Sequence, residues 1–444
     1  MNKESISISK VIAFFRKSIF KTKFYVFSEI LLLVVIMAAV IYSEPSFLKE
    51  PETCAICHEE IYNDWSESTH AWSWKSPVFA GMRTEGYLLG PFNGESCMHC
   101  WSPVSPFETP DEPIDGSMVS SLAEQGVQCI FCHGSDISSG IKEAEAFPIM
   151  MHMLRFPSAK LISNREFLSS SEFCGTCHGT QYQVFLTTSF KEKGLDCQDC
   201  HMNEFPGEPV LNQSTFTQNV DNESKKVYHR FAGSKLYHSE YREYDQLREQ
   251  QLKFLYSAMK INIVEPEKVM AGEPLELIVA LSNVGSPHNF PEGRPPGKEA
   301  WVELIVRDKD ENVFSHTGEP QYNLRDLEDK TVLRRIYIPN ETGEAEGKYW
   351  QVLRGNVERI HYFVPPDTTI HQVFTVPIPE NAAFPISITA NLRYKSLMQE
   401  YADHYMDKPG YVVSAVIIAS DKKEFSGMSE LSEAISNRKA ESLQ

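Results

Sequence analysis

The chain has 444 residues, 42% of them hydrophobic and 11% aromatic, which is enough for two or three globular domains and excludes a disordered protein. Its 42 basic and 60 acidic residues give a formal net charge of −18 at pH 7. A balance this acidic argues against a nucleic-acid partner and fits a basic partner protein or simple solubility.

Residues 1–43 combine a basic stretch with an apolar run. Residues 1–29 carry six basic and two acidic side chains, a net charge of +4, and the run Ile30–Tyr42 follows them. This order is typical of an export signal whose basic side stays in the cytoplasm. The run is shorter than the roughly 20 residues that span a bilayer, and no Ala-x-Ala cleavage site follows it. A cleaved signal stays open, and we expect an uncleaved transmembrane anchor on the periplasmic face.

Residues 44–236 contain all ten cysteines, arranged as five Cys-x-x-Cys pairs. A histidine directly follows four of these pairs: Cys54 and Cys57 with His58, Cys129 and Cys132 with His133, Cys174 and Cys177 with His178, and Cys197 and Cys200 with His201. Cys-x-x-Cys-His is the attachment motif of c-type haem, in which both thiols bond to the porphyrin and the histidine binds iron. We therefore expect four covalently bound haem c groups.

Cys-x-x-Cys alone also fits zinc ribbons and short disulfides. The histidines argue against both, because histidine occupies roughly one position in forty and should not follow four of five pairs by accident. The stretches between the pairs are rich in glycine, serine and proline and show little periodicity. They predict a mostly helical and irregular domain that wraps around stacked haems, which supply the missing apolar volume.

The remaining chain predicts a helix, a β-domain and a tail. Residues 237–258 are charged and helix-prone and predict a connecting helix, with Leu247, Leu252, Leu255 and Tyr256 as packing positions. Residues 259–420 predict an antiparallel, immunoglobulin-like β-sandwich. Its expected strands are Lys260–Val264, Leu275–Leu281, Trp301–Arg307, Val332–Ile338, Arg359–Val364, Gln372–Val376, Ile386–Tyr394 and Tyr411–Ala419, with a hairpin turn at 308–312. Residues 421–444 predict a charged surface helix or loose tail, so the whole is an α+β multidomain protein.

These motifs resemble the cytochrome c554 family, within the wider group related to hydroxylamine oxidoreductase. The pattern from Cys54 to Ala71, with Ile61, Tyr62, Trp65, Ser68 and His70 at its fixed positions, is similar to the family's first haem motif. Gly126–His133 and Cys197–Met202 resemble later motifs, and Asn283–Pro291 and Leu392–Tyr394 resemble the C-terminal domain of some members. The resemblance implies electron transfer through closely stacked haems, and its enzymatic relatives keep catalysis open.

A haem with two histidine ligands needs a second imidazole from elsewhere in the chain. Such six-coordinate iron suits electron relay, and ten of the 14 histidines lie outside the four motifs. His70 and His229 occupy places that resemble ligand segments of the family, His152 lies in an apolar segment, and His288 lies in a proline-flanked loop of the β-domain. His238 is the fifth distal candidate. Each has a plain structural alternative, and we expect a structural or exposed role for the others, His316, His361, His371 and His404.

The fifth pair, Cys97 and Cys100, is followed by Trp101, which has no lone pair for iron. Three outcomes stay open. The site has lost its haem and the cysteines form a disulfide, or it keeps a fifth haem whose iron is held by one distal histidine or an outside ligand, or it binds haem through an unusual histidine such as His99. In the second outcome, the iron has an open position for nitric oxide, hydroxylamine or another small ligand.

The sequence thus predicts an exported cytochrome that passes single electrons along four or five haems. Its partners would be redox proteins or quinol-linked donors. One alternative is an oxidoreductase that acts on a small nitrogen or sulfur compound at the Cys97/Cys100 haem. Another is a structural subunit, in a homo- or hetero-oligomer, of a larger redox complex or cytochrome filament. No residue is assigned a catalytic role.

Overall fold

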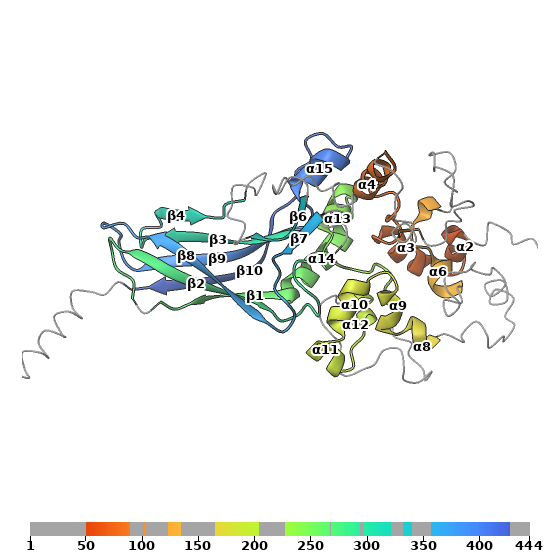
Figure 1. Ribbon diagram of the computed structural model, residues 1–444, viewed down its shortest axis with the longest axis horizontal. Coiled ribbons are helices and arrows are strands. Elements are labelled where there is room, and N and C mark those ends of the chain that lie inside the picture. The colour runs from red at the N-terminus through yellow and green to blue at the C-terminus, as the bar shows by residue number, and fades with distance from the viewer. Residues whose placement is uncertain are drawn as a thin grey trace, which may run out of the picture.

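The computed structural model describes residues 50–88, 101–102, 123–134, 165–203, 227–266, 268–293, 297–320, 332–339 and 357–426. Short helices form the first half of this structure and antiparallel strands form most of the second (Figure 1). The predicted α+β class is therefore confirmed. The expected anchor, residues 1–43, lies outside these ranges. Within them, no helix has both the length and the apolar character that crossing a membrane requires.

The helical part consists of short segments joined by turns. They are α2 (Pro51–Ala55), α3 (Glu59–Glu67), α4 (Pro77–Leu88), the 3-10 helix η2 (Ala123–Gln125), α6 (Cys129–Gly134), α8 (Arg165–Leu168), α9 (Ser171–Gly175), α10 (Gly179–Phe185), α11 (Ser189–Glu192) and α12 (Cys197–His201). One of its buried apolar clusters contains only Phe185, Phe190 and Leu195, with Tyr182 packed against it. A cluster this small agrees with a fold that depends on apolar cofactors.

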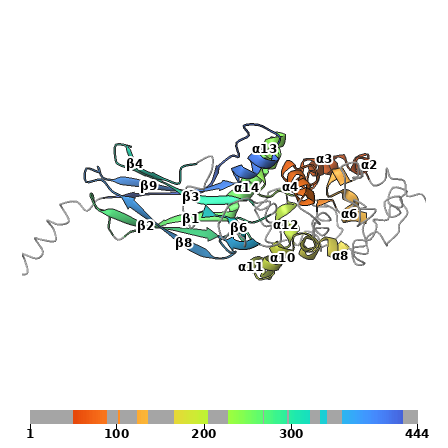
Figure 2. The same ribbon diagram turned by 45° about the horizontal axis from the view of Figure 1, so that its top comes forward.

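The predicted connecting helix is two helices, α13 (Leu236–Arg242) and α14 (Asp245–Ala258). Glu243 separates them in a left-handed conformation, with φ of 61°, which ends a helix. Leu247 and Leu255 are buried as predicted, whereas Tyr256 is exposed. Both helices lie between the short helices and the sheets in two views (Figures 1 and 2).

Two antiparallel sheets share one core. The first has the order β1 (Met259–Val264), β2 (Pro274–Asn283), β8 (Thr369–Pro377). The second has the order β10 (Val416–Phe425), β9 (Ile386–Lys395), β3 (Glu299–Arg307), β4 (Val313–Thr317), with β5 (Val332–Leu333) also on β3. A separate ladder joins β6 (Arg335–Pro339) and β7 (Val357–His361). Leu277 and Val279 of the first sheet and Leu304 and Ile388 of the second belong to one buried cluster, so the sheets pack face to face as predicted.

The predicted strands differ from the observed ones where a strand contains charged or exposed side chains. The expected strand Val332–Ile338 is interrupted at Arg334, whose buried guanidinium lies 3.3 Å from a Glu299 oxygen. Strand β10 begins later than predicted and continues to Phe425, because charged residues of an edge strand do not show the apolar alternation. Strand β4 was not predicted, since most of its side chains are exposed or half-buried. The hairpin turn at 308–312 is confirmed, with the Asp308 carboxylate accepting bonds from two backbone amides.

The helical part and the sheets are joined by hydrogen bonds and by a shared apolar cluster. The Tyr394 hydroxyl donates to the Ser234 carbonyl at 2.8 Å, and the Tyr237 amide donates to the Ser396 hydroxyl at 2.8 Å. Helix α15 (Gln399–Tyr405), which was not predicted, packs near α4. One buried cluster contains residues from both parts, namely Trp72, Val78, Tyr237, Leu397, Met398, Tyr401, Ala402, Met406 and Val413. The loops at this end of the sheets are thereby held against the helical part.

Replacing Tyr394 by phenylalanine is expected to lower the free energy of unfolding by about 1–3 kcal/mol. The half-buried Ser234 carbonyl would lose its donor, and the fully buried ring of residue 394 would stay in place. Denaturant unfolding measures the change. Tyr256→Phe is the control because Tyr256 is 53% exposed, and its unfolding free energy should stay within 0.5 kcal/mol of the parent, the usual range for surface substitutions. Equal effects in the two variants would contradict the prediction.

Candidate haem centres

Two of the four motifs have the same local fold. In the first motif, helix α2 ends after Ala55, and His58 directly precedes α3. In the third, α9 ends at Gly175, and His178 directly precedes α10. The His58 amide donates to the Cys54 carbonyl and the His178 amide to the Cys174 carbonyl, each at 2.9 Å. The remaining two motifs each lie within one helix, α6 or α12. In all four, a turn of helix holds both thiols and the histidine close together, as attachment to one macrocycle requires.

The cysteines of different motifs are neighbours in space. The Cys54 and Cys129 thiols share a side-chain hydrogen bond, which lowers the pKa of Cys54 to about 7 and raises the pKa of Cys129. Cys174 and Cys197 are bonded in the same way, which raises the pKa of Cys174 and lowers that of Cys197. Cys132 also acts electrostatically on Cys174. The four attachment sites therefore form a continuous series, and none of the eight cysteines that the structure describes is in a disulfide.

Two motif histidines face distal candidates. The ring centres of His178 and His70 are 6.3 Å apart, and those of His133 and His229 are 6.2 Å apart. Two imidazoles that bind one metal through Nε2 at about 2.0 Å, with about 1.1 Å from that nitrogen to the ring centre, have centres about 6.2 Å apart when they lie on opposite sides. The side chains alone thus fit two metal centres with two histidine ligands each.

Backbone contacts select the nitrogen that these histidines offer. Nδ1 of His229 donates to the Val227 carbonyl at 3.1 Å, and Nδ1 of His201 donates to the Ala232 carbonyl at 2.7 Å. A carbonyl only accepts, so the proton is on Nδ1 and the lone pair is on Nε2. A hydrogen bond of this kind orients the imidazole and raises its basicity as a metal ligand.

Desolvation favours the neutral form of the imidazoles. Burial lowers the pKa of His70 to about 3 and that of His133 to about 4, and it also lowers the pKa values of His201 and His229. A neutral imidazole has the lone pair that iron binds, whereas an imidazolium has none. The donor set therefore fits haem iron near neutral pH.

His288 enters the same region from the sheets. It lies in the loop after β2, and burial lowers its pKa to about 4, with the nearby His201 as the next cause. The buried Asn283 amide donates to the His288 carbonyl at 2.9 Å and to the Val364 carbonyl at 3.1 Å. His288 Nδ1 lies 3.1 Å from the Ser286 hydroxyl, which already donates to the His288 carbonyl, so Nδ1 is the donor here too. The loop thus presents a neutral imidazole to the region of His201 and His178.

The other two distal candidates differ. His238 is fully buried in α13, where its Nε2 donates to the Glu67 carbonyl at 2.8 Å and its ring contacts Trp72 at 4.5 Å. His238 thus uses Nε2 for a hydrogen bond, whereas His201 and His229 use Nδ1 and leave Nε2 available for a metal. The contacts of His238 suit a structural role. His152 lies outside the described residues, as do His99, Cys97 and Cys100 of the fifth pair.

Trp101, which follows the fifth pair, has a defined environment. Its ring stacks on Phe79, with centres 4.2 Å apart and planes 7° apart. The Ser73 hydroxyl donates to the Trp101 carbonyl. The Lys235 ammonium lies 5.2 Å from the centre of the Trp101 ring, and burial lowers the pKa of Lys235 to about 8. The tryptophan is therefore a packed residue with an amine beside it.

Arg230 and Lys235 were not predicted from the sequence. Arg230 lies next to His229 and makes ion pairs with Asp64 at 3.1 Å and Glu67 at 3.2 Å, which fix the His229 segment to α3. The sequence offered one indication of its role, namely that Arg230 directly follows the candidate ligand His229. The contact between Lys235 and Trp101 could not be predicted, because the two residues are distant in the sequence.

Arg230→Met is expected to loosen the His229 segment and lower the free energy of unfolding by about 1–3 kcal/mol, since the buried Asp64 and the half-buried Glu67 carboxylates lose their partner. In a haem-loaded protein, the ferric electron paramagnetic resonance signal of an iron bound by both His133 and His229 would be expected to broaden. Arg248→Met removes a comparable 3.1 Å ion pair with Glu240 and should leave that signal unchanged. An unbroadened signal in Arg230→Met would contradict the positioning role.

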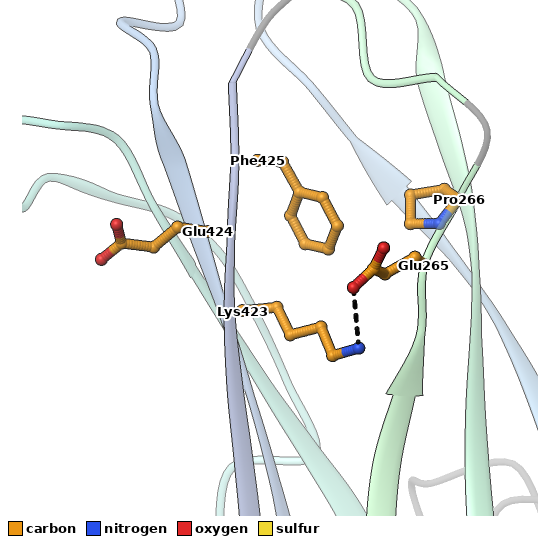
Figure 3. A pocket seen from close by; sticks show the side chains of 5 residues that line it. All are labelled: Glu265, Pro266, Lys423, Glu424 and Phe425. Carbon is orange, nitrogen blue, oxygen red and sulfur yellow. Dashed lines mark hydrogen bonds and ion pairs between the residues drawn. The ribbon is translucent and has the colours of Figure 1, made fainter.

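One pocket lies at the opposite end of β1 from the His288 loop. Glu265, Pro266, Lys423, Glu424 and Phe425 line it, and a Lys423 amine pairs with a Glu265 oxygen at 3.2 Å (Figure 3). Met259 at the start of β1 pairs with Asn283, whereas Val264 at its end pairs with Ile278. The pocket is thus separated from the histidines by the length of β1, and its lining contains neither histidine nor cysteine.

Comparisons with known proteins concern one segment of the sequence and the overall fold. Residues 53–134 match the family model for cytochrome c554 and c-prime. The structure is similar to the crystal structure of a penta-haem cytochrome c552 from Thermochromatium tepidum, at 16% identity and a TM-score of 0.54, over 85% of this chain and 100% of that one. A sporulation control protein, Spo0M from Bacillus subtilis, matches at 12% identity over 40% of this chain and 55% of that one, but its TM-score of 0.17 carries no argument. No curated protein matches the sequence significantly.

Proposed function

We propose that the chain is a multihaem c-type cytochrome of the cytochrome c554 type, and that it carries single electrons along four haem c groups with two histidine ligands each. The observation that carries the proposal is the separation of two histidine pairs, 6.3 and 6.2 Å between ring centres. Each bound iron supplies a one-electron couple between its ferric and ferrous states.

We assign the ligands as follows. His178 and His70 serve the haem of Cys174 and Cys177, and His133 and His229 serve that of Cys129 and Cys132. His201 and His288 serve the haem of Cys197 and Cys200, which the shared electrostatic contact of the two imidazoles supports. His58 is the proximal ligand of the first haem, for which His152 stays the predicted distal partner.

The protein side chains do three things in this function. They fill both axial positions with neutral imidazoles, so that coordination does not change between redox states. They hold the imidazole orientation through Nδ1 contacts with backbone carbonyls such as those of Val227 and Ala232. They keep successive attachment sites in contact, through Cys54 with Cys129 and Cys174 with Cys197, so that neighbouring haems are close enough for electron exchange.

Ferric electron paramagnetic resonance of the haem-loaded protein, with intact mass for the haem count, tests this function. Low-spin signals from four haems are expected. Fewer than four attached haems, or high-spin iron at these four sites, would overturn the assignment. The mass also tests our proposal that residues 1–43 direct export and remain as an anchor on the extracytoplasmic face, because their loss would be visible as a smaller protein.

Trp101 favours one second function, redox chemistry on a small nitrogen or sulfur compound at the fifth pair. Its indole cannot bind iron, and it replaces the proximal histidine in a fifth haem motif. Ferric or ferrous iron with an open position should bind added nitric oxide, with a spectral change for one haem in five. A protein whose spectrum does not respond to nitric oxide would be a carrier only.

A further inference from the structure

The loop before β8 contacts the helical part through the side chain of Asp367. One oxygen of this carboxylate, Oδ2, accepts a hydrogen bond from the Ser189 amide, and Oδ1 accepts one from the Ser189 hydroxyl, both at 3.0 Å. Ser189 is the first residue of α11, where backbone amides have no partner within their own helix. The two residues are 178 positions apart in the sequence, so the carboxylate connects distant segments of the chain.

The backbone around Asp367 is bonded to the segment that carries His288. The Asp367 amide donates to the Asn283 carbonyl at 3.1 Å, and the Asn283 amide donates to the Thr368 carbonyl at 3.0 Å. The Asn283 side chain in turn donates to the His288 carbonyl at 2.9 Å. A continuous series of hydrogen bonds therefore connects Asp367 with the loop that presents the His288 imidazole.

On the other side of the contact, α11 is bonded to the start of the helix that ends at His201. Residues 193–196 connect α11 to α12. The Leu195 amide donates to the Phe190 carbonyl at 3.2 Å, and both side chains belong to one buried cluster. The Lys191 amine also pairs with Asp196, the N-cap of α12, at 3.6 Å. A displacement of the start of α11 is therefore transmitted to α12 and His201.

We propose that Asp367 is a positioning residue for the haem centre of His201 and His288. Its carboxylate fixes the helix that carries one imidazole to the loop that carries the other. These imidazoles come from different parts of the chain, whereas metal–ligand distances are constant to within about 0.2 Å, so the two segments need a fixed separation. The inference rests on the proposed function, because it requires one haem iron bound by both histidines.

Two variants of Asp367 separate the carboxylate from the backbone, which has φ of 56° at this residue. Asp367→Gly removes the side chain and suits this left-handed conformation. Asp367→Asn also tolerates it, and its amide group can still accept from the Ser189 amide and bond the Ser189 hydroxyl. The matched control is Asp308→Gly, because the Asp308 carboxylate accepts bonds from the amides of Asp310 and Asn312 at 2.9 Å each. This turn joins β3 to β4 on the side of the sheets away from the helical part (Figures 1 and 2).

The readouts are intact mass and ferric electron paramagnetic resonance of each haem-loaded protein, since the low-spin signal depends on the orientation of both axial imidazoles. We expect the same haem count in every variant. In Asp367→Gly, about a quarter of the low-spin signal from four bis-histidine haems should shift and broaden. This component should be the one that His288→Ala removes. Asp367→Asn and the Asp308→Gly control should have the parental spectrum.

A further variant tests the same contact from the opposite residue. Ser189→Ala removes the hydroxyl bond and keeps the amide bond, so it should shift the same component by less than Asp367→Gly does. A parental spectrum in Asp367→Gly, equal changes in all low-spin components, or an Asp367→Asn spectrum as altered as that of Asp367→Gly would overturn the positioning role. Failure of the proposed function would instead be visible in the parent, as fewer than four haems or high-spin iron at these sites.

Discussion

Replacing His70 by alanine is expected to convert the haem of Cys174 and Cys177 from low-spin to high-spin without loss of the haem. The His70 ring centre lies 6.3 Å from that of His178, so the substitution removes one of two axial nitrogens. About a quarter of the low-spin ferric signal from four bis-histidine haems should disappear and a high-spin signal should replace it. Electron paramagnetic resonance measures this change, and intact mass shows that the haem count is the same.

Two further variants sharpen this prediction. His70→Met supplies a thioether, so the haem should stay low-spin and its reduction potential should rise. His371→Ala is the control, because His371 is exposed on β8. A His70→Ala protein with the parental low-spin signal would show that another residue binds this iron.

His288→Ala is expected to have a comparable spectral effect on the haem of Cys197 and Cys200 and to weaken the attachment of the sheets to the helical part. His288 reaches the region of His201 from the loop after β2, so one iron would join the two parts of the protein. About a quarter of the low-spin signal should become high-spin. In thermal unfolding, the shift of the haem absorption band and the loss of β-structure in circular dichroism should occur at different temperatures, instead of together.

The control for His288→Ala tests the loop separately from the ligand. Asn283→Ala removes the amide that donates to the His288 and Val364 carbonyls and leaves the imidazole in place. It should lower the unfolding free energy by about 1–3 kcal/mol and keep most of the low-spin signal, since buried carbonyls lose a donor but the iron keeps its ligand. Parental spectra in His288→Ala would contradict the role of His288 as a ligand.

The sequence predicted the strands that carry several apolar side chains into the core. Strands β1, β2, β3, β8 and β9 agree closely with their predicted ranges, because their core-facing residues are apolar. The break between α13 and α14 could not be predicted, since it depends on a left-handed Glu243, a conformation that no glycine marks. Strand β10 was displaced for a related reason, because its last residues are charged on an exposed edge.

The sequence identifies candidate ligands of the site, but it does not show which of them lie near one another. The motif histidines follow from covalent chemistry, which is local in sequence, and His70, His229 and His288 were among the candidates. Which imidazole faces which motif depends on tertiary packing: His70 lies opposite His178, more than 100 residues away in sequence, and not opposite His58. The contacts of His238 with Glu67 and Trp72 are equally invisible in the sequence.

The central claim is that histidines from distant segments are paired across shared iron atoms. Anomalous scattering at the iron absorption edge, measured on crystals of the haem-loaded protein, locates each iron directly. One iron is expected midway between the rings of His70 and His178, and another midway between those of His133 and His229. An iron bound to His178 or His133 with a different residue on its opposite side would contradict the pairing.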